Sequence, residues 1–358
     1  MKAEEVAATR LFDSGQQLLV PIWQRRYTWD RRDWLELWKD LQHLQATPTA
    51  SHFIGSIVLK ALPWRGLPSE AKRYWVVDGQ QRAITLTLLA AAIRDRLARL
   101  SGSDEERVAV NRAYTDQLFR NASLKEGHQE RLILQAQDAN RLDPIVGGPP
   151  GDLSNAPIDR AYAFFAKELG HLASEELEEL LSILLVRMVA VWVVLEENDN
   201  AHRVFQTLNA GGKALRQADL VRNYFFLLLG DAGDDFYHAH WRLLEADLPA
   251  KELEEYFVAW TITQGYTGGK QSLFSYFQSD LSSAEDDANA VLQYGRALTA
   301  TARQFQWIRK PEDSPLVTAK GPLLELRAWG TGQWHSVVAT PLAGGGRARR
   351  AVWGCVGC

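Results

Sequence analysis

The sequence predicts an α+β protein in which a small N-terminal part of mixed α/β structure is followed by a mainly α-helical domain. Short runs rich in β-branched and aromatic residues occur before residue 100. From Ala83 to Leu100, apolar residues recur with helical spacing. The chain of 358 residues is also longer than one compact core usually is, so two domains are expected.

The N-terminal elements are predicted from local signals. Pro21 ends a short apolar run, as expected at the end of a strand. Asp30 has the side chain of a helix N-cap and precedes an apolar pattern that includes Trp34 and Trp38. In order, we expect a helix over 4–13, a strand over 17–20, a helix from Asp30 through Leu41, strands over 53–59 and 74–77, and a helix over 83–100.

Beyond Ser101-Gly102-Ser103, helical patterns dominate. The glycines and prolines at 147–151 predict an exposed loop over 143–157, and a β-branched run predicts a buried strand over 189–195. Helices are expected over 159–169, 174–185, 201–208 and 217–229, with later ones centred on Trp241, Tyr256 and Phe274. The expected divisions are residues 1–100, a helical domain over 101–340 that completes a pocket, and a disordered or truncated tail over 341–358.

Composition limits the class of protein. With 40 Lys and Arg against 44 Asp and Glu, the net charge is -4, so any contact with nucleic acid must come from a local basic patch. The apolar run from Leu180 to Leu195 is interrupted by Arg187, and the N-terminus resembles no signal peptide, so we expect a cytoplasmic protein without membrane contact. Cys355 and Cys358 could form half of a zinc site, but an incidental tail is favoured.

The segment Asp78-Gly79-Gln80-Gln81-Arg82 lies where a predicted strand gives way to a predicted helix. A helix start carries free N–H groups and the positive end of the helix dipole, so it stabilises an anion. Gly79 permits a tight turn, and Arg82 can hold a phosphate with two hydrogen bonds. Asp78 could bind Mg²⁺ or orient a water. The alternative is that Asp78 only caps the helix while the glutamines face solvent.

A second segment, residues 21–32, interleaves arginines with aromatic rings. The arginines are Arg25, Arg26, Arg31 and Arg32, and the rings are Trp23, Tyr27 and Trp29. Guanidinium groups pair with phosphates while rings stack on bases, so this segment is a candidate nucleic-acid contact. The alternative places the rings in the core and the arginines in solvent or in ion pairs.

A third segment, from Phe205 to Asn223, combines a glycine-containing connector with a polar pair. Asn209 can end a helix, and Asp219 and Asn223 lie four residues apart on one face of the next predicted helix. A buried polar pair requires partners. The segment is therefore either a simple connector or part of a binding site.

Together, these three segments resemble the N-terminal domain of the GmrSD-type restriction endonucleases, a family with a ParB-like start. The matching residues are Pro21, Gln24, Arg25, Tyr27, Trp29, Asp78 through Arg82, Leu208, Asn209, Gly212, Asp219, Leu220, Arg222 and Asn223. Trp23 replaces a tyrosine of the family pattern, so a hydroxyl donor is missing there. The resemblance covers about residues 10–340. Within this family, the chain also resembles the DNA-sensing proteins of phosphorothioate-dependent anti-phage defence.

The resemblance implies a domain that binds and hydrolyses GTP or ATP with Mg²⁺, and that licenses the cutting of foreign or modified double-stranded DNA. It implies catalytic roles for Asp78 (also the metal ligand), Gln80, Gln81 and Arg82; nucleotide binding by Gln24, Arg25, Tyr27, Gly79, Asn209, Asp219 and Asn223; and DNA binding by Trp23, Arg26, Arg31 and Arg32.

The nuclease of this family is a C-terminal domain with an HNH-type motif, and no such motif follows Pro341. We therefore expect no nuclease activity from this chain alone, and a partnership with an HNH-type nuclease domain or subunit. The main alternative is a non-enzymatic DNA-binding module that uses the same basic pocket. A toxin-like or structural interaction protein is a third possibility, which rests on the helical second half.

Overall fold

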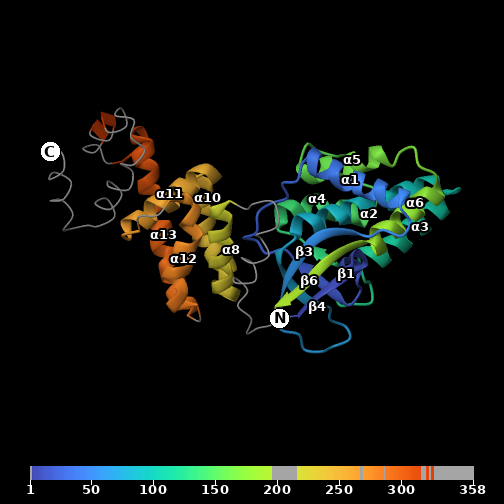
Figure 1. The fold of residues 1–358 in the computed structure, drawn as a ribbon, viewed down its shortest axis with the longest axis horizontal. Coiled ribbons are helices and arrows are strands. Elements are labelled where there is room, and N and C mark those ends of the chain that lie inside the picture. The colour runs from blue at the N-terminus through green and yellow to red at the C-terminus, as the bar shows by residue number, and fades with distance from the viewer. Residues whose placement is uncertain are drawn as a thin grey trace. The chain divides into compact units, whose positions relative to one another are not determined.

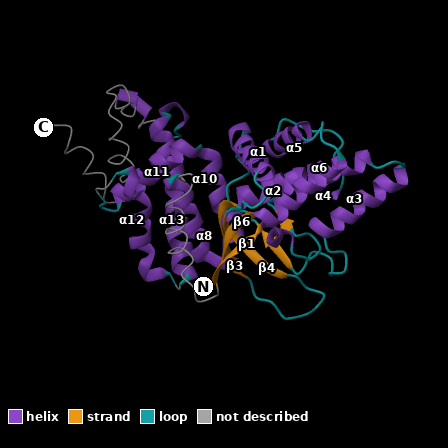
Figure 2. Ribbon diagram, turned by 45° about the vertical axis from the view of Figure 1, so that its right-hand side comes forward, coloured by secondary structure: helices purple, strands orange, loops and turns teal. Residues whose placement is uncertain are grey.

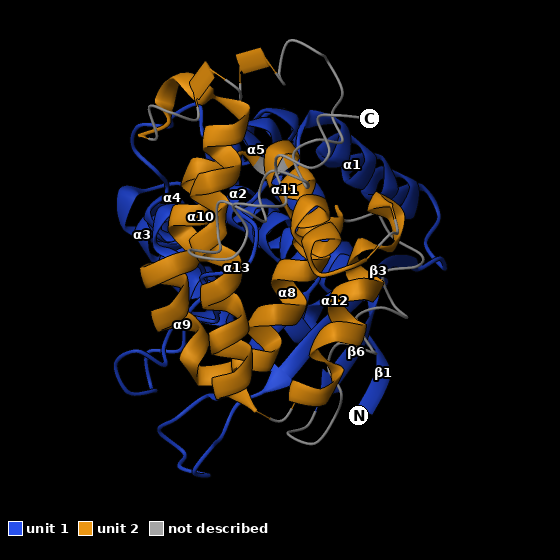
Figure 3. Ribbon diagram, turned by 90° about the vertical axis from the view of Figure 1, so that its left-hand side faces the viewer, with its two compact units in different colours: residues 1–213 blue, residues 214–358 orange. Residues whose placement is uncertain are grey.

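The computed structural model describes residues 2–195, 216–266, 269–285, 287–315, 320–321 and 324–325. The chain forms two compact units, residues 1–213 and 214–358 (Figures 1 and 3). The predicted helix over 201–208 and the predicted tail over 341–358 lie outside the described residues.

A mixed six-stranded sheet forms the base of the first unit. Its strands are β1 (Lys2–Ala7), β2 (Gln16–Leu19), β3 (His52–Ala61), β4 (Lys72–Asp78), β5 (Leu132–Ile133) and β6 (Met188–Leu195). They lie in the order β1-β6-β3-β4-β2-β5. β6 pairs antiparallel with β1 and parallel with β3, and β3 pairs antiparallel with β4, while β2 is parallel to β4 and β5. The sheet is therefore complete only when β6 enters between β1 and β3.

Helix α2 (Gln80–Leu100) is the centre of the first unit. Every residue from Ala83 to Ile93 is at most 6% exposed, as expected for a helix that is apolar on all sides. The surrounding helices are α1 (Arg31–Ala46), α3 (Asp104–Leu118), α4 (Ala136–Gly147), α5 (Pro157–Glu168) and α6 (Ser174–Ser182). α3, α4, α5 and α6 pack directly on α2, and Figure 2 shows these helices gathered on one side of the sheet.

The first compact unit extends well past the boundary expected at residue 100. Helices α3 to α6 cover α2, and β6 supplies an internal strand of the sheet, so residues 101–195 belong to the same core. The predicted mixed α/β start followed by a helical region is confirmed, with the helical region beginning later in the chain.

Most predicted elements of the first unit are confirmed, and two are wrong. The predicted helix over 4–13 is β1 followed by a short 3₁₀ helix over Ala8–Phe12, because pairing with β6 favours the extended chain. The predicted loop over 143–157 begins instead as the end of α4, which contains Pro144. Burial of Leu142 and Ile145 in the core holds this last turn helical despite the proline.

The second unit is a helical bundle around an aromatic core. Its longer helices are α8 (Gln217–Leu229), α11 (Ala250–Thr263), α12 (Leu273–Leu281) and α13 (Ala288–Arg309), with the short α9 (Gly233–Phe236) and α10 (Arg242–Asp247) between α8 and α11. Phe225, Trp241 and Phe277 are fully buried there. The helix predicted over 217–229 has these bounds in the structure, and those predicted around Trp241, Tyr256 and Phe274 are also present. Within the described residues, no helix combines the length and apolarity needed to cross a membrane.

Gly295 offers a test of this second core. A Cβ at this position of α13 would lie 2.3 Å from the ring of Phe225, so Gly295→Ala is expected to lower the free energy of unfolding by about 1–3 kcal/mol through overpacking. Chemical denaturation measures the change. Gly269→Ala is the control, because a Cβ there meets no atom within 4 Å. Equal stability of the two variants would contradict the close packing.

Candidate functional site

The predicted turn joins β4 directly to α2. β4 ends at Asp78, Gly79 adopts a left-handed φ of 91°, and α2 begins at Gln80. A Cβ on Gly79 would lie 2.9 Å from the carbonyl oxygen of Ser56, so both the backbone angle and the available space require glycine. The predicted strand, turn and helix are confirmed. The helix begins earlier than predicted, which places both glutamines in its first turn.

The side-chain amide of Gln81 holds the loop that carries the arginines and aromatic rings. Its oxygen accepts hydrogen bonds from the backbone N–H groups of Thr28 (2.8 Å) and Trp29 (3.3 Å). Its nitrogen donates to the carbonyl oxygen of Arg26 at 3.1 Å. Gln81 is only 5% exposed, and these three hydrogen bonds position the loop against the first turn of α2.

Gln80 and Gln24 form a second link between the turn and the loop. Nε2 of Gln80 donates to Oε1 of Gln24 (3.2 Å) and to the carbonyl oxygen of Arg25 (3.0 Å). Nε2 of Gln24 donates to the carbonyl oxygen of Val77 at 3.1 Å. Both side chains are 5% exposed. The predicted catalytic and nucleotide-binding glutamines therefore join β4, α2 and the loop.

The aromatic rings of the loop belong to the core. Trp23 is 1% exposed and packs edge-on against Trp75, so its ring is not available to stack on a base. The Tyr27 hydroxyl accepts from Trp34 (2.8 Å) and bonds with Thr85 (2.7 Å). Burial raises the pKa of Tyr27 above its ordinary value, so this hydroxyl stays protonated. For these two rings, the alternative of core packing describes the structure better than the predicted ligand contacts.

Asp138 on α4 is a site residue that the sequence analysis missed. Its carboxylate accepts from the backbone N–H of Tyr27 (2.8 Å) and from Nε of Arg26 (3.1 Å), and forms an ion pair with the Arg26 guanidinium at 3.0 Å. Asp138 is 5% exposed. The predicted DNA contact Arg26 is thus already engaged, although its side chain is half exposed. No local pattern marks Asp138, because its partners lie 111 residues away or more.

Arg82 lies across the β3 backbone. Its guanidinium donates to the carbonyl oxygen of Ser56 and stacks closely on Gly55, where a Cβ would lie 3.0 Å from its central carbon. Gly55 has a φ of 98° at an irregularity of the pairing between β3 and β6. Arg82 is half-buried, and a guanidinium has five N–H donors, so donors remain for an anion.

Asp78 is the accessible carboxylate of the turn. It is half-buried, and its side chain makes no hydrogen bond or ion pair with a described residue. Across the described ranges, no three His, Cys, Asp or Glu side chains group into a metal site. Mg²⁺ commonly uses one or two carboxylates together with water and phosphate oxygens. Asp78 fits that limited role.

The remaining predicted residues of the first unit lie in two places. Arg25 is half-buried beside Gln80, whose amide bonds its carbonyl oxygen. Arg31 and Arg32 are exposed at the start of α1, where Asp30 forms the capping box, and neither forms an ion pair with a described residue.

The third predicted segment lies partly in the second unit. Asp219 on α8 pairs with Arg222 at 3.1 Å, and Arg222 also bonds Glu245 at 2.7 Å. Asn223 is 4% exposed, and its Oδ1 has no hydrogen-bond partner among the residues that the structure describes. Asn209 lies outside the described residues, and the nucleotide-binding role expected of Asn209, Asp219 and Asn223 stays a prediction.

The first unit is a mixed α/β protein in which a buried central helix presents its N-terminus between acidic and basic side chains. The chain matches the family described as GmrSD restriction endonuclease, N-terminal domain, over residues 8–226, and it belongs to that family. The match confirms the predicted family and associates the chain with DNA restriction systems. A search of curated proteins finds no match.

The role of Asp138 can be tested by Asp138→Asn. This change removes the charge and one acceptor, so we expect the free energy of unfolding to fall by about 1–3 kcal/mol and the amide of Tyr27 to exchange faster with solvent. Denaturation and hydrogen exchange measure the two effects.

Asp159→Asn is the matched control. Asp159 is also buried, at 3% exposed, and accepts from the backbone N–H of Ser154 at 2.7 Å. Its substitution should cost similar stability without changing exchange at Tyr27. Unchanged exchange at Tyr27 in Asp138→Asn would contradict the positioning role.

Proposed function

We propose that the first unit binds a nucleoside triphosphate at the N-terminus of α2 and hydrolyses it, as the sensor part of a modification-dependent restriction system. One observation carries the proposal: the buried first turn of α2 has no side-chain cap among the described residues, and it lies between Asp78 and Arg82. A buried helix start requires partners for its N–H groups. The dipole of this 21-residue helix adds attraction for an anion.

In this proposal, Arg82, Arg25 and Asp78 have different roles in phosphate binding and hydrolysis. Arg82 and Arg25 bind phosphate oxygens and offset the charge that develops on the transferred group. Asp78 would hold Mg²⁺, which would supply positive charge beside the phosphate oxygens, and Asp78 would also orient a water. The water forms a bond to the terminal phosphorus and passes its proton to a phosphate oxygen, while the bond from that phosphorus to the bridging oxygen breaks, so the products are the nucleoside diphosphate and inorganic phosphate.

The glutamines support this chemistry indirectly. Gln80 and Gln81 keep loop residues 24–29 against the first turn of α2, and Gln80 holds the backbone carbonyl of Arg25 there. In this proposal the glutamines are positioning residues, and Asp78 and Arg82 keep the catalytic roles predicted for them.

The output of the proposed sensor is the cutting of DNA by another domain. Membership of the GmrSD family supports modified or foreign double-stranded DNA as the partner, and an HNH-type nuclease domain or subunit as the element that cuts it. Triphosphate turnover in the cytoplasm would then report that DNA is bound and would license the cut.

The nucleotide proposal is tested by calorimetry and phosphate release with each triphosphate, with and without modified DNA. Asp78→Ala and Arg82→Ala should each weaken binding about tenfold or more, since a hydrogen bond to a charged group contributes about 1.5–3 kcal/mol. Arg112→Ala, on an exposed α3 side chain, is the control. Absence of triphosphate binding by the intact chain would rule the proposal out.

A second candidate function is a DNA-binding module without hydrolysis. It is favoured by Arg31 and Arg32, which are exposed side by side at the start of α1 and make no ion pair with a described residue. Such unpaired guanidinium groups suit the phosphates of a DNA backbone.

The DNA contact is tested by duplex binding between about 50 and 200 mM salt. The double variant Arg31→Ala, Arg32→Ala should reduce the slope of log affinity against log salt by about two, because each lost phosphate contact reduces it by about one. Lys39→Ala, an exposed position further along α1, is the control and should leave the slope unchanged. An unaltered slope in the double variant would place the DNA contact elsewhere.

A further inference from the structure

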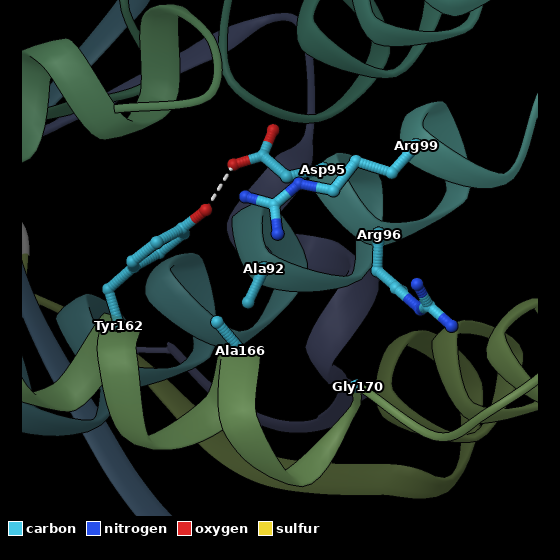
Figure 4. A pocket seen from close by; sticks show the side chains of 7 residues that line it. All are labelled: Ala92, Asp95, Arg96, Arg99, Tyr162, Ala166 and Gly170. Carbon is cyan, nitrogen blue, oxygen red and sulfur yellow. Dashed lines mark hydrogen bonds between the residues drawn. The ribbon is translucent and has the colours of Figure 1, made fainter. Parts of the chain in front are cut away.

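A cavity of about 210 Å³ lies in the first unit between the C-terminal half of α2 and α5 (Figure 4). Ala92, Ala166 and Gly170 leave the space open, because none of them has a large side chain. The cavity begins twelve residues along α2 from Gln80, which is about 18 Å along the helix axis. It is therefore separate from the turn at Asp78.

The charges around this cavity do not balance. Asp95 is 2% exposed and forms a 2.8 Å ion pair with the fully buried Arg94, so these two charges offset each other. The second oxygen of Asp95 accepts from the Tyr162 hydroxyl at 2.6 Å, as the dashed line in Figure 4 shows. Arg96 and Arg99 also line the cavity, and neither forms an ion pair with a carboxylate of a described residue.

The two arginines have hydrogen-bond donors to spare. Arg99 is exposed and makes no ion pair with a described residue. Arg96 donates to the carbonyl oxygen of Leu172 at 3.3 Å, but its Nε is buried without a partner. In Figure 4 the Arg99 guanidinium lies on the Tyr162 side of the cavity, and that of Arg96 on the Gly170 side. An anion in the cavity would lie between these two positive charges, and a buried donor without an acceptor is costly.

The end of α2 adds no free acceptor at this position. The carbonyl oxygens of Leu97 and Ala98 already accept from the backbone N–H of Ser101. Among the described residues, these two carbonyls therefore supply no acceptor for Arg96 or Arg99.

We propose that this cavity binds a small phosphate anion, either inorganic phosphate or the terminal phosphate of a small ester. The volume equals that of about seven water molecules at about 30 Å³ each. It is below the roughly 300 Å³ typical of pockets for larger ligands, so a phosphate group fits and a whole nucleotide does not. Guanidinium groups match the geometry of phosphate oxygens, and two of them offset its charge.

The test uses inorganic phosphate in an Arg82→Ala background, so that the turn at Asp78 does not contribute. Calorimetry and thermal stability are compared with chloride at equal ionic strength. Arg96→Gln with Arg99→Gln should weaken phosphate binding about tenfold or more. Ala166→Leu should weaken it as well, because the larger side chain fills the cavity without changing the charge.

Arg160→Gln is the matched control, since it removes the same charge from an exposed position on α5 outside the cavity lining. It should leave phosphate binding within twofold of the background, which is less than about 0.4 kcal/mol. The proposal is overturned if the background binds no phosphate, if the cavity variants bind it normally, or if Arg160→Gln loses binding equally. Loss of triphosphate turnover elsewhere would not alter this outcome, because the site does not depend on the proposed hydrolysis.

Discussion

The side-chain amide of Gln81 connects the first turn of α2 to the loop over 24–29, and the geometry of the candidate site depends on this connection. An amide carries both an acceptor and donors, so one uncharged side chain bonds the N–H groups of Thr28 and Trp29 and the carbonyl of Arg26. A carboxylate would offer acceptors alone, and an ammonium donors alone. Because the link is neutral, it holds the loop without cancelling the positive charge of the arginines.

The orientation of the neighbouring amides is determined by the backbone. Gln24 donates to the carbonyl of Val77, which leaves its oxygen to accept from Gln80, and Gln80 donates a second bond to the carbonyl of Arg25. Reversing either amide would bring two acceptors together. The end of β4, the start of α2 and the loop are therefore held together by these hydrogen bonds. Asp138 connects α4 to the same loop, because its carboxylate accepts from the backbone N–H of Tyr27.

Local signals in the sequence predicted the structure correctly where a single residue determines the backbone conformation. Asp30 correctly marked the start of α1, and Gly79 the turn into α2. Local signals failed where the partner is distant: β1 looked helical because its pairing with β6 lies almost 190 residues away. Asp138 went unnoticed for the same reason. Trp23 stands beside arginines in the sequence, and only its burial in the folded unit distinguishes a core residue from a stacking platform.

The position of β6 in the sheet has a consequence for synthesis of the chain. The ribosome adds about 5–20 residues per second, so residues 188–195 are made roughly 10–40 s after β1. Until then, β1 and β3 each lack β6 as their neighbour in the sheet. Unpaired strand edges on nascent chains can join one another, and such non-local pairing is slow to complete. The exposed Lys2, Glu4 and Glu5 on β1 oppose that joining, so the charges protect the growing chain before the sheet exists.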